Sequence, residues 1–266
     1  MPETFRDRVV VITGGAGGIG RALAARFLKS GARVAALDLD EASLAELAEG
    51  TASDRLMTLK VDITDESATR AALKEVTERF GGVDVLVNNA GLVHRSSFKD
   101  TEANVFRRVM EVNYFGSIHV TKAALPSLVE RRGMIVVISS VAGLVPLFGR
   151  SGYSASKHAL HGLFESLRAE LADDGVGVLM VCPSFTTTPF EGRALGAHGE
   201  RVARPRSKVG KEATPESVAD AIHDATLARK KLVVLSPVGK VAVWLSRIAP
   251  GMYQRSMTRS LKSELT

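Results

Sequence analysis

The chain has 266 residues, a hydrophobic content of 45%, a charged content of 24% and a formal net charge of +6. These values are ordinary for a globular protein and allow one large core. The lone cysteine, Cys182, excludes an intrachain disulfide and a cysteine-rich metal site, so we expect no metal and an inert, buried thiol. No signal peptide and no apolar run of roughly 18 residues is found, which favours a cytoplasmic protein.

Positive charge gathers in residues 229–266, where eight Lys or Arg residues stand against the single acid Glu264. A basic tail can bind nucleic acid, anionic lipid or a phosphorylated ligand, although most such tails are simply solvated. No nucleic-acid motif or basic patch interleaved with aromatic residues accompanies this one. We therefore expect no nucleic-acid partner.

A β-branched run, residues 9–13, predicts a buried strand of a parallel sheet, and a glycine-rich turn and a helical pattern follow it. This order predicts a dinucleotide site, because glycines let backbone amides approach a pyrophosphate at a helix N-terminus. Two patterns fit the turn: G-x-G-x-x-G on Gly15, Gly17 and Gly20, or T-G-x-x-x-G-x-G on Thr13, Gly14, Gly18 and Gly20. A glycine turn without a ligand is the alternative.

The second predicted strand, residues 33–38, ends on the carboxylate of Asp38. An acid at this point accepts hydrogen bonds from the adenosine ribose hydroxyls and repels a 2′-phosphate. No Arg or Lys lies between Thr13 and Gly20, and Leu39 follows Asp38, so the sequence favours NAD over NADP. Alternatively, Asp38 only caps the following helix, a role that Asp40 could fill instead.

Five more strands are predicted at residues 56–61, 83–87, 134–138, 176–181 and 232–235, with helical patterns between them. This β-α alternation predicts an α/β fold: a single doubly wound Rossmann domain, with a seven-stranded parallel sheet and helices on both faces. Ligands bind at the carboxyl ends of such strands, where Asp62, the Asn88-Asn89-Ala90-Gly91 run and Ser139-Ser140 are expected.

Tyr153 and Lys157 lie four residues apart in a predicted helix, residues 152–172, so both stand on one of its faces. A tyrosine with a pKa near 10 is a poor base at neutral pH, but an ammonium about 4 Å away contributes roughly 4 kcal/mol at an effective dielectric of about 20. That energy lowers a pKa by about three units. The pair therefore predicts a tyrosine base activated by a lysine; a surface pair on an amphipathic helix is the alternative.

Ser140, thirteen positions before Tyr153, completes a set that resembles the active site of the classical short-chain dehydrogenases/reductases. The glycine turn, the Asn88-Asn89-Ala90-Gly91 run and Asn113-Tyr114-Phe115-Gly116 resemble further motifs of this family, and the likeness covers roughly residues 7–236. The resemblance implies four catalytic residues: Asn113, Ser140, Tyr153 and Lys157. It also implies cofactor contacts at Gly14, Gly17, Gly18, Ile19, Gly20, Asp38, Asp62, Ile63, Asn89, Ala90, Gly91, Tyr153, Lys157, Pro183, Thr186 and Thr188.

The implied chemistry is hydride transfer between nicotinamide and a carbonyl or alcohol carbon. Tyr153 would exchange the proton with the substrate oxygen, Ser140 would hydrogen-bond that oxygen, and Lys157 would lower the tyrosine pKa and hold the nicotinamide ribose. Asn113 would bend its helix and keep a water of the proton relay. The positive nicotinamide of NAD⁺ would lower the tyrosine pKa further, which favours the dehydrogenase direction.

The segment after the sixth strand departs from the family pattern. Thr188 matches the threonine that contacts the nicotinamide carboxamide, but Ser184 replaces the usual glycine and Thr186 an aliphatic residue, so Thr186 could share this contact. Apolar residues in two segments predict a lipophilic secondary alcohol or ketone, steroid-, retinoid- or fatty-like, unless they belong to the core: Leu144, Val145, Leu147, Phe148, Phe185 and Phe190. His94 and Arg95 could meet a polar end of the substrate, but we expect them to be solvent-exposed loop residues.

We divide the chain into a catalytic domain, residues 1–237, with a substrate loop at about 184–212, and an amphipathic basic extension, residues 238–266. Val241, Trp244, Leu245 and Ile248 form one apolar stripe of a short helix in that extension. The stripe packs on the protein's own body or on a subunit partner; alternatively, it covers a lipophilic substrate or rests on an anionic membrane surface.

The resemblance to the family implies a homodimer or homotetramer. Two other functions stay open: a non-catalytic NAD-sensing module, and a peripheral membrane protein anchored by its tail.

Overall fold

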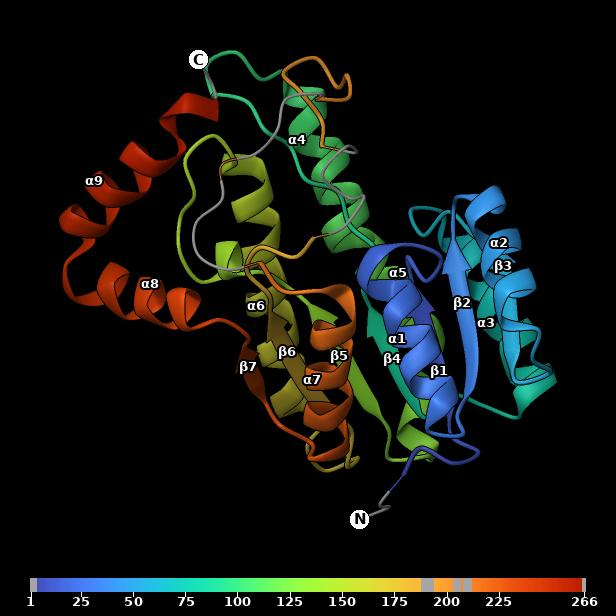
Figure 1. The fold of residues 1–266 in the computed structure, drawn as a ribbon. Helices are drawn as coiled ribbons and strands as arrows, with labels where there is room; N and C mark the ends of the chain where they lie inside the picture. The colour runs from blue at the N-terminus through green and yellow to red at the C-terminus, as the bar shows by residue number, and fades with distance from the viewer. Residues whose placement is uncertain (1–3, 188–193, 203–206, 208–211, 265–266) are drawn as a thin grey trace.

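The computed structural model describes residues 4–187, 194–202, 207 and 212–264. Among them lies a seven-stranded sheet in the order β3-β2-β1-β4-β5-β6-β7, with every neighbouring pair parallel (Figure 1). The strands are β1 (Val9–Thr13), β2 (Arg33–Asp38), β3 (Leu56–Lys60), β4 (Val85–Asn88), β5 (Met134–Ile138), β6 (Gly177–Cys182) and β7 (Leu232–Val234). The predicted α/β doubly wound fold is therefore confirmed.

Helices cover both faces of this sheet. On one face lie α1 (Gly18–Lys29), α2 (Glu41–Thr51) and α7 (Pro215–Leu227). On the other face lie α3 (Glu66–Phe80), α5 (Gly116–Glu130) and α6 (Ser151–Glu170). The order reverses between β1 and β4, and this switch point brings the carboxyl ends of both strands to one edge, where open α/β sheets bind ligands.

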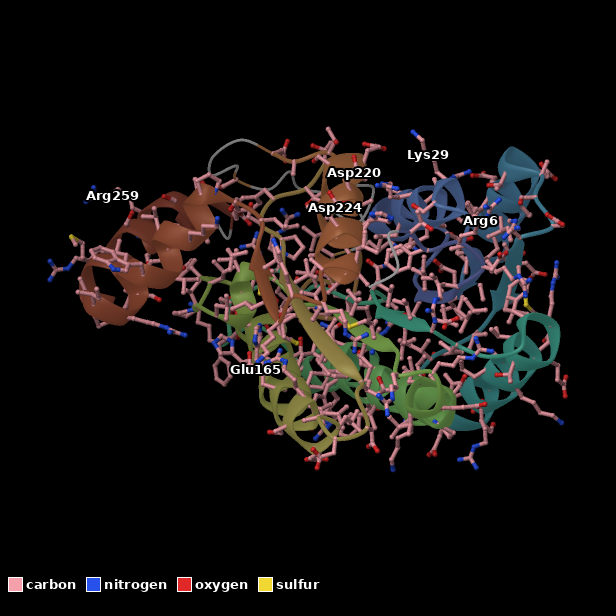
Figure 2. The ribbon with its side chains drawn as sticks, turned by 90° about the horizontal axis from the view of Figure 1, so that it is seen from below. Arg6, Lys29, Glu165, Asp220, Asp224 and Arg259 are labelled. Atoms are coloured by element: carbon pink, nitrogen blue, oxygen red, sulfur yellow. The ribbon has the colours of Figure 1, made fainter. Side chains whose placement is uncertain are left out.

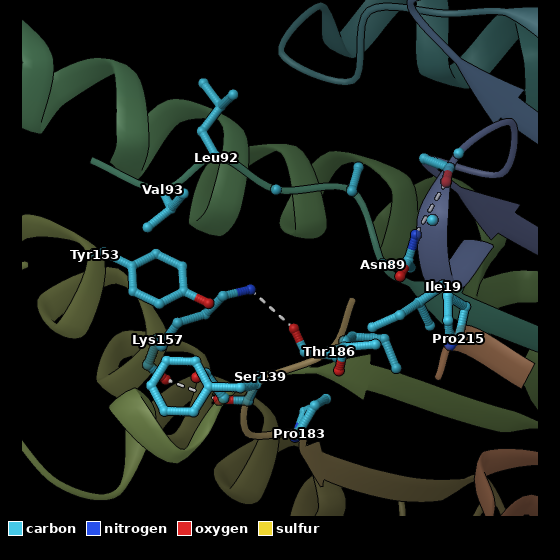
Figure 3. Close-up of a pocket in the computed structure, with 18 of the residues that line it drawn as sticks. Ile19, Asn89, Leu92, Val93, Ser139, Tyr153, Lys157, Pro183, Thr186 and Pro215 are labelled. Atoms are coloured by element: carbon cyan, nitrogen blue, oxygen red, sulfur yellow. Dashed lines mark hydrogen bonds between the residues drawn. The ribbon is translucent and has the colours of Figure 1, made fainter. Parts of the chain in front are cut away.

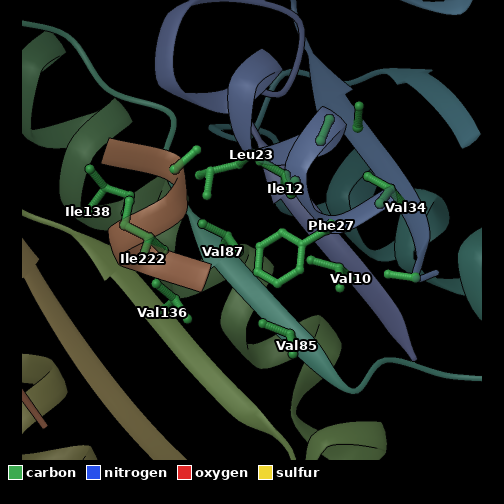
Figure 4. Close-up of a cluster of buried hydrophobic side chains, with 14 of the residues drawn as sticks. Val10, Ile12, Leu23, Phe27, Val34, Val85, Val87, Val136, Ile138 and Ile222 are labelled. Carbon is green, nitrogen blue, oxygen red and sulfur yellow. The ribbon is translucent and has the colours of Figure 1, made fainter. Parts of the chain in front are cut away.

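The strands are apolar on both sides because both faces of the sheet are covered. In β1, Val10 and Ile12 face the α1 and α7 layer, whereas Val9 and Val11 face the opposite layer. Phe27 of α1 and Ile222 of α7 fill the space above β1, β4 and β5 (Figure 4). These side chains have no exposed surface, so the glycine turn between β1 and α1 rests on a close-packed base.

The outer surfaces of α1 and α7 are joined by charge. Arg26 Nε donates to the Asp220 carboxylate at 2.7 Å, and a second guanidinium nitrogen lies 3.8 Å from Asp224. Figure 2 shows Asp220 and Asp224 on the α7 side that borders α1. Exposed pairs of this kind contribute at most about 1 kcal/mol, so packing rather than charge holds the two helices together.

The helix predicted at residues 104–130 is interrupted. It consists of α4 (Ala103–Met110), a π-helical turn η1 (Glu111–Phe115) and α5, and Asn113 lies in the middle of the turn. A π-helical turn widens the helix locally and is frequent at functional sites.

The C-terminal extension forms two helices, α8 (Pro237–Ile248) and α9 (Pro250–Leu261), followed by a 3₁₀ turn, η4 (Lys262–Glu264). The helix predicted from the stripe that begins at Val241 and ends at Ile248 is confirmed, and it lies within α8. Pro237 and Pro250 each begin a helix, as proline's fixed φ favours. The helix pair extends sideways from the β7 edge of the sheet (Figure 1).

Candidate active site

The turn between β1 and α1 needs glycine at four points, one of which is Gly15, whose Cβ would lie 2.9 Å from Ala36 Cα. Gly14 and Gly18 have φ values of +62° and +49°, which side chains rarely adopt. A Cβ on Gly20 would lie 2.0 Å from the Gly14 carbonyl oxygen, so α1 could not approach the turn. Gly17 has an extended backbone and no atom within 4 Å of its missing Cβ. The geometry therefore matches the T-G-x-x-x-G-x-G reading, with Gly17 facing open space.

The run after β4 is tied to this turn by Asn89. Its amide donates to the carbonyl oxygens of Thr13 at 2.9 Å and Gly14 at 3.0 Å, while the Thr13 hydroxyl accepts from the backbone N–H groups of Asn89 and Ala90, both at 3.0 Å. A side chain thus takes over the hydrogen bonds that the ends of β1 and β4 cannot make to each other. Gly91, the last residue of the run, lies close to Asn113 and Lys157: a Cβ there would be 3.0 Å from Asn113 Oδ1 and 3.6 Å from Lys157 Nζ.

Asp38 lies at the end of β2 and borders the same cavity as the glycine turn. Its carboxylate accepts from Ala16 N–H at 3.1 Å and from Asp40 N–H at 3.2 Å, while the side chain of Asp40 caps α2. Asp38 therefore positions the turn as well as facing the cavity. The guanidinium of Arg21, also at the cavity rim, points to Glu46 at 3.6 Å.

Asp62 and Ile63, which follow β3, also border the cavity. Asp62 is exposed and accepts from the N–H and the hydroxyl of Thr64 at 2.9 and 2.7 Å. Ile63 is buried, and it fills the place of the missing side chain of Gly116. Ile19, at the start of α1, also lines the cavity.

Ser140, rather than its neighbour Ser139, meets Tyr153. The Ser140 hydroxyl accepts from Ala142 N–H at 3.1 Å, and a hydrogen bond to Tyr153 opposes the rise of the tyrosine pKa. The Ser139 hydroxyl instead points toward the Lys157 carbonyl oxygen at 3.5 Å. The two serines after β5 therefore point in different directions, and of the two only Ser140 hydrogen-bonds the phenol of Tyr153.

Lys157 and Tyr153 are brought together, but their electrostatics differ from the expectation. Lys157 Nζ lies 5.8 Å from the ring centroid of Tyr153 and donates to the Ile138 carbonyl oxygen at 2.8 Å. Burial raises the pKa of Tyr153 above its usual 10, against the lowering effects of the Ser140 hydrogen bond and the Arg150 charge. Burial also lowers the pKa of Lys157 to about 8. The expected net lowering of the Tyr153 pKa is therefore not found in the protein alone, because loss of hydration at the phenol outweighs the Ser140 hydrogen bond and the Arg150 charge.

Asn113 is fully buried and holds the segment after β4 against α6. Its Oδ1 accepts from Leu92 N–H at 2.6 Å, and its Nδ2 donates to the Leu92 carbonyl oxygen at 2.9 Å and to Ser156 Oγ at 2.8 Å. Ser156 in turn donates to the Tyr153 carbonyl oxygen at 2.8 Å. The π-helical turn thus connects to the backbone of Tyr153 through Ser156, a residue that the sequence analysis missed because its spacing carries no motif.

Gly14, Asp38, Ser140, Tyr153 and Lys157 border one cavity of about 1700 Å³, whereas Gly20 and Asn113 do not line it. This volume exceeds the roughly 300–1000 Å³ of a pocket for one small ligand. Figure 3 shows Tyr153 and Lys157 on one side of it, with Asn89 and Ile19 on the other. Pro183 and Thr186 line the space between, whereas Thr188 falls outside the described residues. The cavity extends from the glycine turn to Tyr153, so both parts of the candidate site face one space.

The family model described as short chain dehydrogenase matches residues 8–196. The chain belongs to the short-chain dehydrogenase family. It is 38% identical to Dehydrogenase/reductase SDR family member 7B of Bos taurus, over 99% of this chain and 84% of that protein. It is 37% identical to a Dehydrogenase/reductase SDR family protein 7-like of Anopheles gambiae, over 94% of this chain and 81% of that protein.

Solved structures agree with this membership. A short-chain dehydrogenase from Streptomyces avermitilis superposes with a TM-score of 0.79 at 30% identity, covering 95% of this chain and 96% of its own. A short chain dehydrogenase/reductase from Burkholderia phymatum, solved in complex with NAD, gives a TM-score of 0.84 at 26% identity with the same coverage. The chain is thus an oxidoreductase of a family that binds a nicotinamide cofactor and a small-molecule substrate.

Beyond the matched residues of this dehydrogenase, the C-terminal helices form a further wall of the cavity. Several of their side chains line it beside Leu147, Phe185 and Tyr153: Val238, Val241, Ala242, Leu245, Tyr253, Met257 and Leu261. Tyr253 OH donates to the Pro146 carbonyl oxygen at 3.0 Å, which fixes α9 over the loop before α6. Of the apolar residues predicted to wall the pocket, Leu147 and Phe185 line the cavity, Val145 is buried, and Phe190 falls outside the described residues.

The expectation that His94 and Arg95 are exposed loop residues is wrong. Both are buried, because the 194–202 segment pairs with them: Arg95 N–H donates to the Leu195 carbonyl oxygen at 2.8 Å, and His94 forms a bridge with Leu195. His94 Nδ1 accepts from Tyr153 N–H at 3.3 Å. Burial, followed by the Arg150 charge, lowers the pKa of His94 to about 4. The neutral imidazole therefore supports the start of α6.

Burial raises the pKa of the Cys182 thiol to about 12, so it is not a thiolate nucleophile. Within the described ranges, no cluster of three or more His, Cys, Asp or Glu is arranged to hold a metal ion. Of the helices in this part of the chain, none is both long and apolar enough to cross a bilayer.

Proposed function

We propose that this enzyme transfers a hydride between NAD and a lipophilic secondary alcohol or ketone, using Ser140, Tyr153 and Lys157 with Asn113. The observation that carries the proposal is the meeting of Ser140 and Lys157 at Tyr153 in the same cavity that the glycine turn borders. The two parts of the site come from chain segments more than a hundred residues apart, yet they face one space.

The residues of the glycine end fit a dinucleotide. Gly17 leaves open space beside the N-terminus of α1, whose backbone N–H groups favour a pyrophosphate. The carboxylate of Asp38 borders the cavity at the end of β2, where it would bind ribose hydroxyls and repel a 2′-phosphate. The guanidinium of Arg21, at the cavity rim, lies 3.6 Å from the Glu46 carboxylate, which partly neutralises that cation. These features support NAD over NADP.

When bound, the nicotinamide accepts or returns the hydride at its C4 atom. In alcohol oxidation, the Tyr153 oxygen takes the hydroxyl proton while the carbinol carbon loses its hydride, and a ketone forms; reduction reverses these transfers. Ser140 donates a hydrogen bond to the substrate oxygen, and Lys157 places a positive charge beside the phenol ring. Burial raises the pKa of Tyr153, so the phenol stays protonated and can donate its proton in ketone reduction. Alcohol oxidation needs the deprotonated Tyr153 as base, so its rate should increase as the pH rises.

The apolar cavity wall supports a lipophilic substrate. Leu147, Phe185, Leu245 and Met257 line the cavity, and they come from three separate segments of the chain. A substrate with an extended apolar body would bury that surface at about 25 cal/mol per Å². A steroid-like, retinoid-like or fatty molecule offers such a body, whereas a short polar alcohol does not.

The test is nicotinamide absorbance with NAD⁺ and NADP⁺ over a panel of secondary alcohols, from short polar to steroid and long-chain, with the matching ketones and NADH. We expect turnover with NAD⁺ or NADH on apolar members and its loss in Tyr153→Phe, which keeps the ring and removes the hydroxyl. NADH binding without turnover of any member would refute the proposal and favour a non-catalytic NAD-sensing module.

A second proposal concerns the outer face of α8. Trp244 and Ile248 form an apolar stripe there with Val241, which also reaches the cavity rim, and each is more than 60% exposed; Met252 of α9 is exposed as well. Lys240 and Arg247 are exposed beside the stripe, and Arg259 lies on the outward end of the helix pair (Figure 2). An apolar stripe flanked by cations suits an anionic membrane surface. We therefore propose that α8 and α9 rest on such a surface, next to the cavity that they enclose.

Flotation with phosphatidylglycerol vesicles and with phosphatidylcholine vesicles tests this membrane contact. We expect binding to the anionic vesicles at low salt, a loss of binding at high salt, and a blue shift of the fluorescence of the single tryptophan, Trp244. The variant Ile248→Ser should weaken binding, whereas Phe98→Ser, which removes an exposed ring elsewhere, should not. Equal behaviour of the two variants, or self-association through α8 in light scattering, would contradict the proposal.

We also propose a homodimer or homotetramer that assembles through α5 and α6. Phe115, at the end of the π-helical turn, is 41% exposed and lies on the same helix as Asn113. Light scattering of the purified protein should show two or four copies, and Phe115→Asp should shift that mass toward the monomer. A monomeric wild-type protein would refute this assembly.

A further inference from the structure

The last turn of the chain buries a carboxylate. Glu264, in η4, is 8% exposed as a residue and its side chain is 2% exposed. A carboxylate is costly to bury unless charges and hydrogen bonds compensate it. Arg150 Nη2 donates to Glu264 Oε2, Arg95 Nη1 lies 3.8 Å from the same oxygen, and Ser207 N–H donates to Oε1 at 2.8 Å. Three separate segments therefore converge on one acidic side chain.

Both arginines belong to the segments that hold Tyr153. Arg150 is the N-cap residue of α6, and its carbonyl oxygen accepts from Ser154 N–H at 2.8 Å. Arg95 directly follows His94, whose Nδ1 accepts from Tyr153 N–H. The carboxylate of Glu264 thus connects the start of the Tyr153 helix to the segment that supports it from the β4 side. Both guanidiniums also border the cavity.

The charge of Arg150 reaches the phenol as well. It lowers the pKa of Tyr153, against the larger effect of burial, and it lowers the pKa of His94. Glu264 neutralises part of that charge because it pairs directly with the guanidinium. The titratable and charged groups around Tyr153 come from α6, β6 and the loops before α6 and after β4: Lys157, Cys182, Arg150, His94 and Arg95.

We propose that Glu264 is a positioning residue for Tyr153: through Arg150 and Arg95 it fixes the start of α6 and limits the positive charge at the phenol. It lies outside residues 8–196, which the family model matches. This role rests on the proposed function, in which Tyr153 exchanges the proton with the substrate.

The tail has other attachments, so the role of Glu264 is separable from docking of the tail. Tyr253 OH donates to the Pro146 carbonyl oxygen, and Phe148 N–H donates to the Met257 sulfur at 3.0 Å. Leu261 is 3% exposed and packs at the cavity wall. An isosteric change that removes only the charge of Glu264 should leave α8 and α9 in place.

The experiment compares Glu264→Gln with the matched exposed control Glu75→Gln, by NADH affinity, pH profiles of turnover, and ultraviolet titration of tyrosinate. The Tyr153→Phe variant assigns the Tyr153 component of that titration. We expect Glu264→Gln to keep NADH affinity within about twofold of the wild type. The rate of alcohol oxidation on its high-pH plateau should fall about tenfold, and the ionisation of Tyr153 should move to lower pH. Glu75→Gln should match the wild type.

A double variant decides whether Glu264 acts through Arg150. In the Arg150→Gln background, Glu264→Gln should no longer move the Tyr153 titration, since the charge that it uncovers is absent. An unchanged titration and plateau in Glu264→Gln would overturn the proposal, and so would a titration shift that persists without Arg150. If the wild-type protein turns over no alcohol, the proposed function fails, whereas the titration still decides the coupling between Glu264 and Tyr153.

Discussion

Acid should destabilise this protein through one buried histidine. His94 has no exposed surface, packs against Phe106 at 5.4 Å between ring centroids, and has a pKa of about 4 in the folded state against 6.5 for the free side chain. Its folded pKa is lowered, so its contribution to stability is complete above pH 6.5 and is lost as the pH falls toward 4. A difference of about 2.5 units corresponds to about 3 kcal/mol, a large fraction of a typical 5–15 kcal/mol.

The assay is urea unfolding at several pH values between 7.5 and 4 for the wild type and for His94→Gln, which is uncharged throughout. We expect the variant to be less stable at pH 7.5, because it packs less well, but to lose about 3 kcal/mol less than the wild type on acidification. The matched control His158→Gln, exposed on α6, should follow the wild type. If His94→Gln loses as much stability in acid as the wild type, the reasoning is wrong.

Three further outcomes follow from the site. Replacing Asp38 with serine should raise kcat/KM for NADP⁺ relative to NAD⁺ at least about tenfold, since the carboxylate no longer repels the 2′-phosphate; an unchanged ratio in steady-state kinetics would remove Asp38 from cofactor choice. Gly20→Ala should abolish NADH binding in a fluorescence titration, because its Cβ would lie 2.0 Å from a carbonyl oxygen, whereas Gly162→Ala, with nothing within 4 Å, should bind normally. Asn113→Ala should cost about 3 kcal/mol in urea unfolding, since it leaves both backbone groups of Leu92 without their side-chain partner; a loss below about 1 kcal/mol would contradict this account.

Local patterns were sufficient to predict much of the fold. The β-branched strands and the helices between them alternate so regularly that a doubly wound parallel sheet is the arrangement that buries both faces. The glycine turn was also readable, because a close approach such as that of Gly20 to Gly14 tolerates no side chain. Ser140, Tyr153 and Lys157 could be singled out because their spacing resembles the active site of the family; the shared helix face of Tyr153 and Lys157 alone also fits a surface pair.

Other features depended on contacts between distant segments. His94 and Arg95 have the composition of an exposed loop, and only the pairing with Leu195 buries them. The rise of the Tyr153 pKa could not be foreseen from the spacing to Lys157, because it depends on how many atoms from other segments exclude water from the phenol.

The sequence by itself determined the strand and helix order and the glycine turn, since these follow from local sterics and periodicity, and its resemblance to the family pointed to the candidate reactive side chains. Only the tertiary structure decided what surrounds them. It brings Glu264 to Arg150, 114 positions earlier, and it makes α8 and α9 a wall of the cavity. The physical reason is that burial and charge pairing are properties of the assembled chain: the desolvation of a group and the partner that compensates it are set by segments remote in sequence.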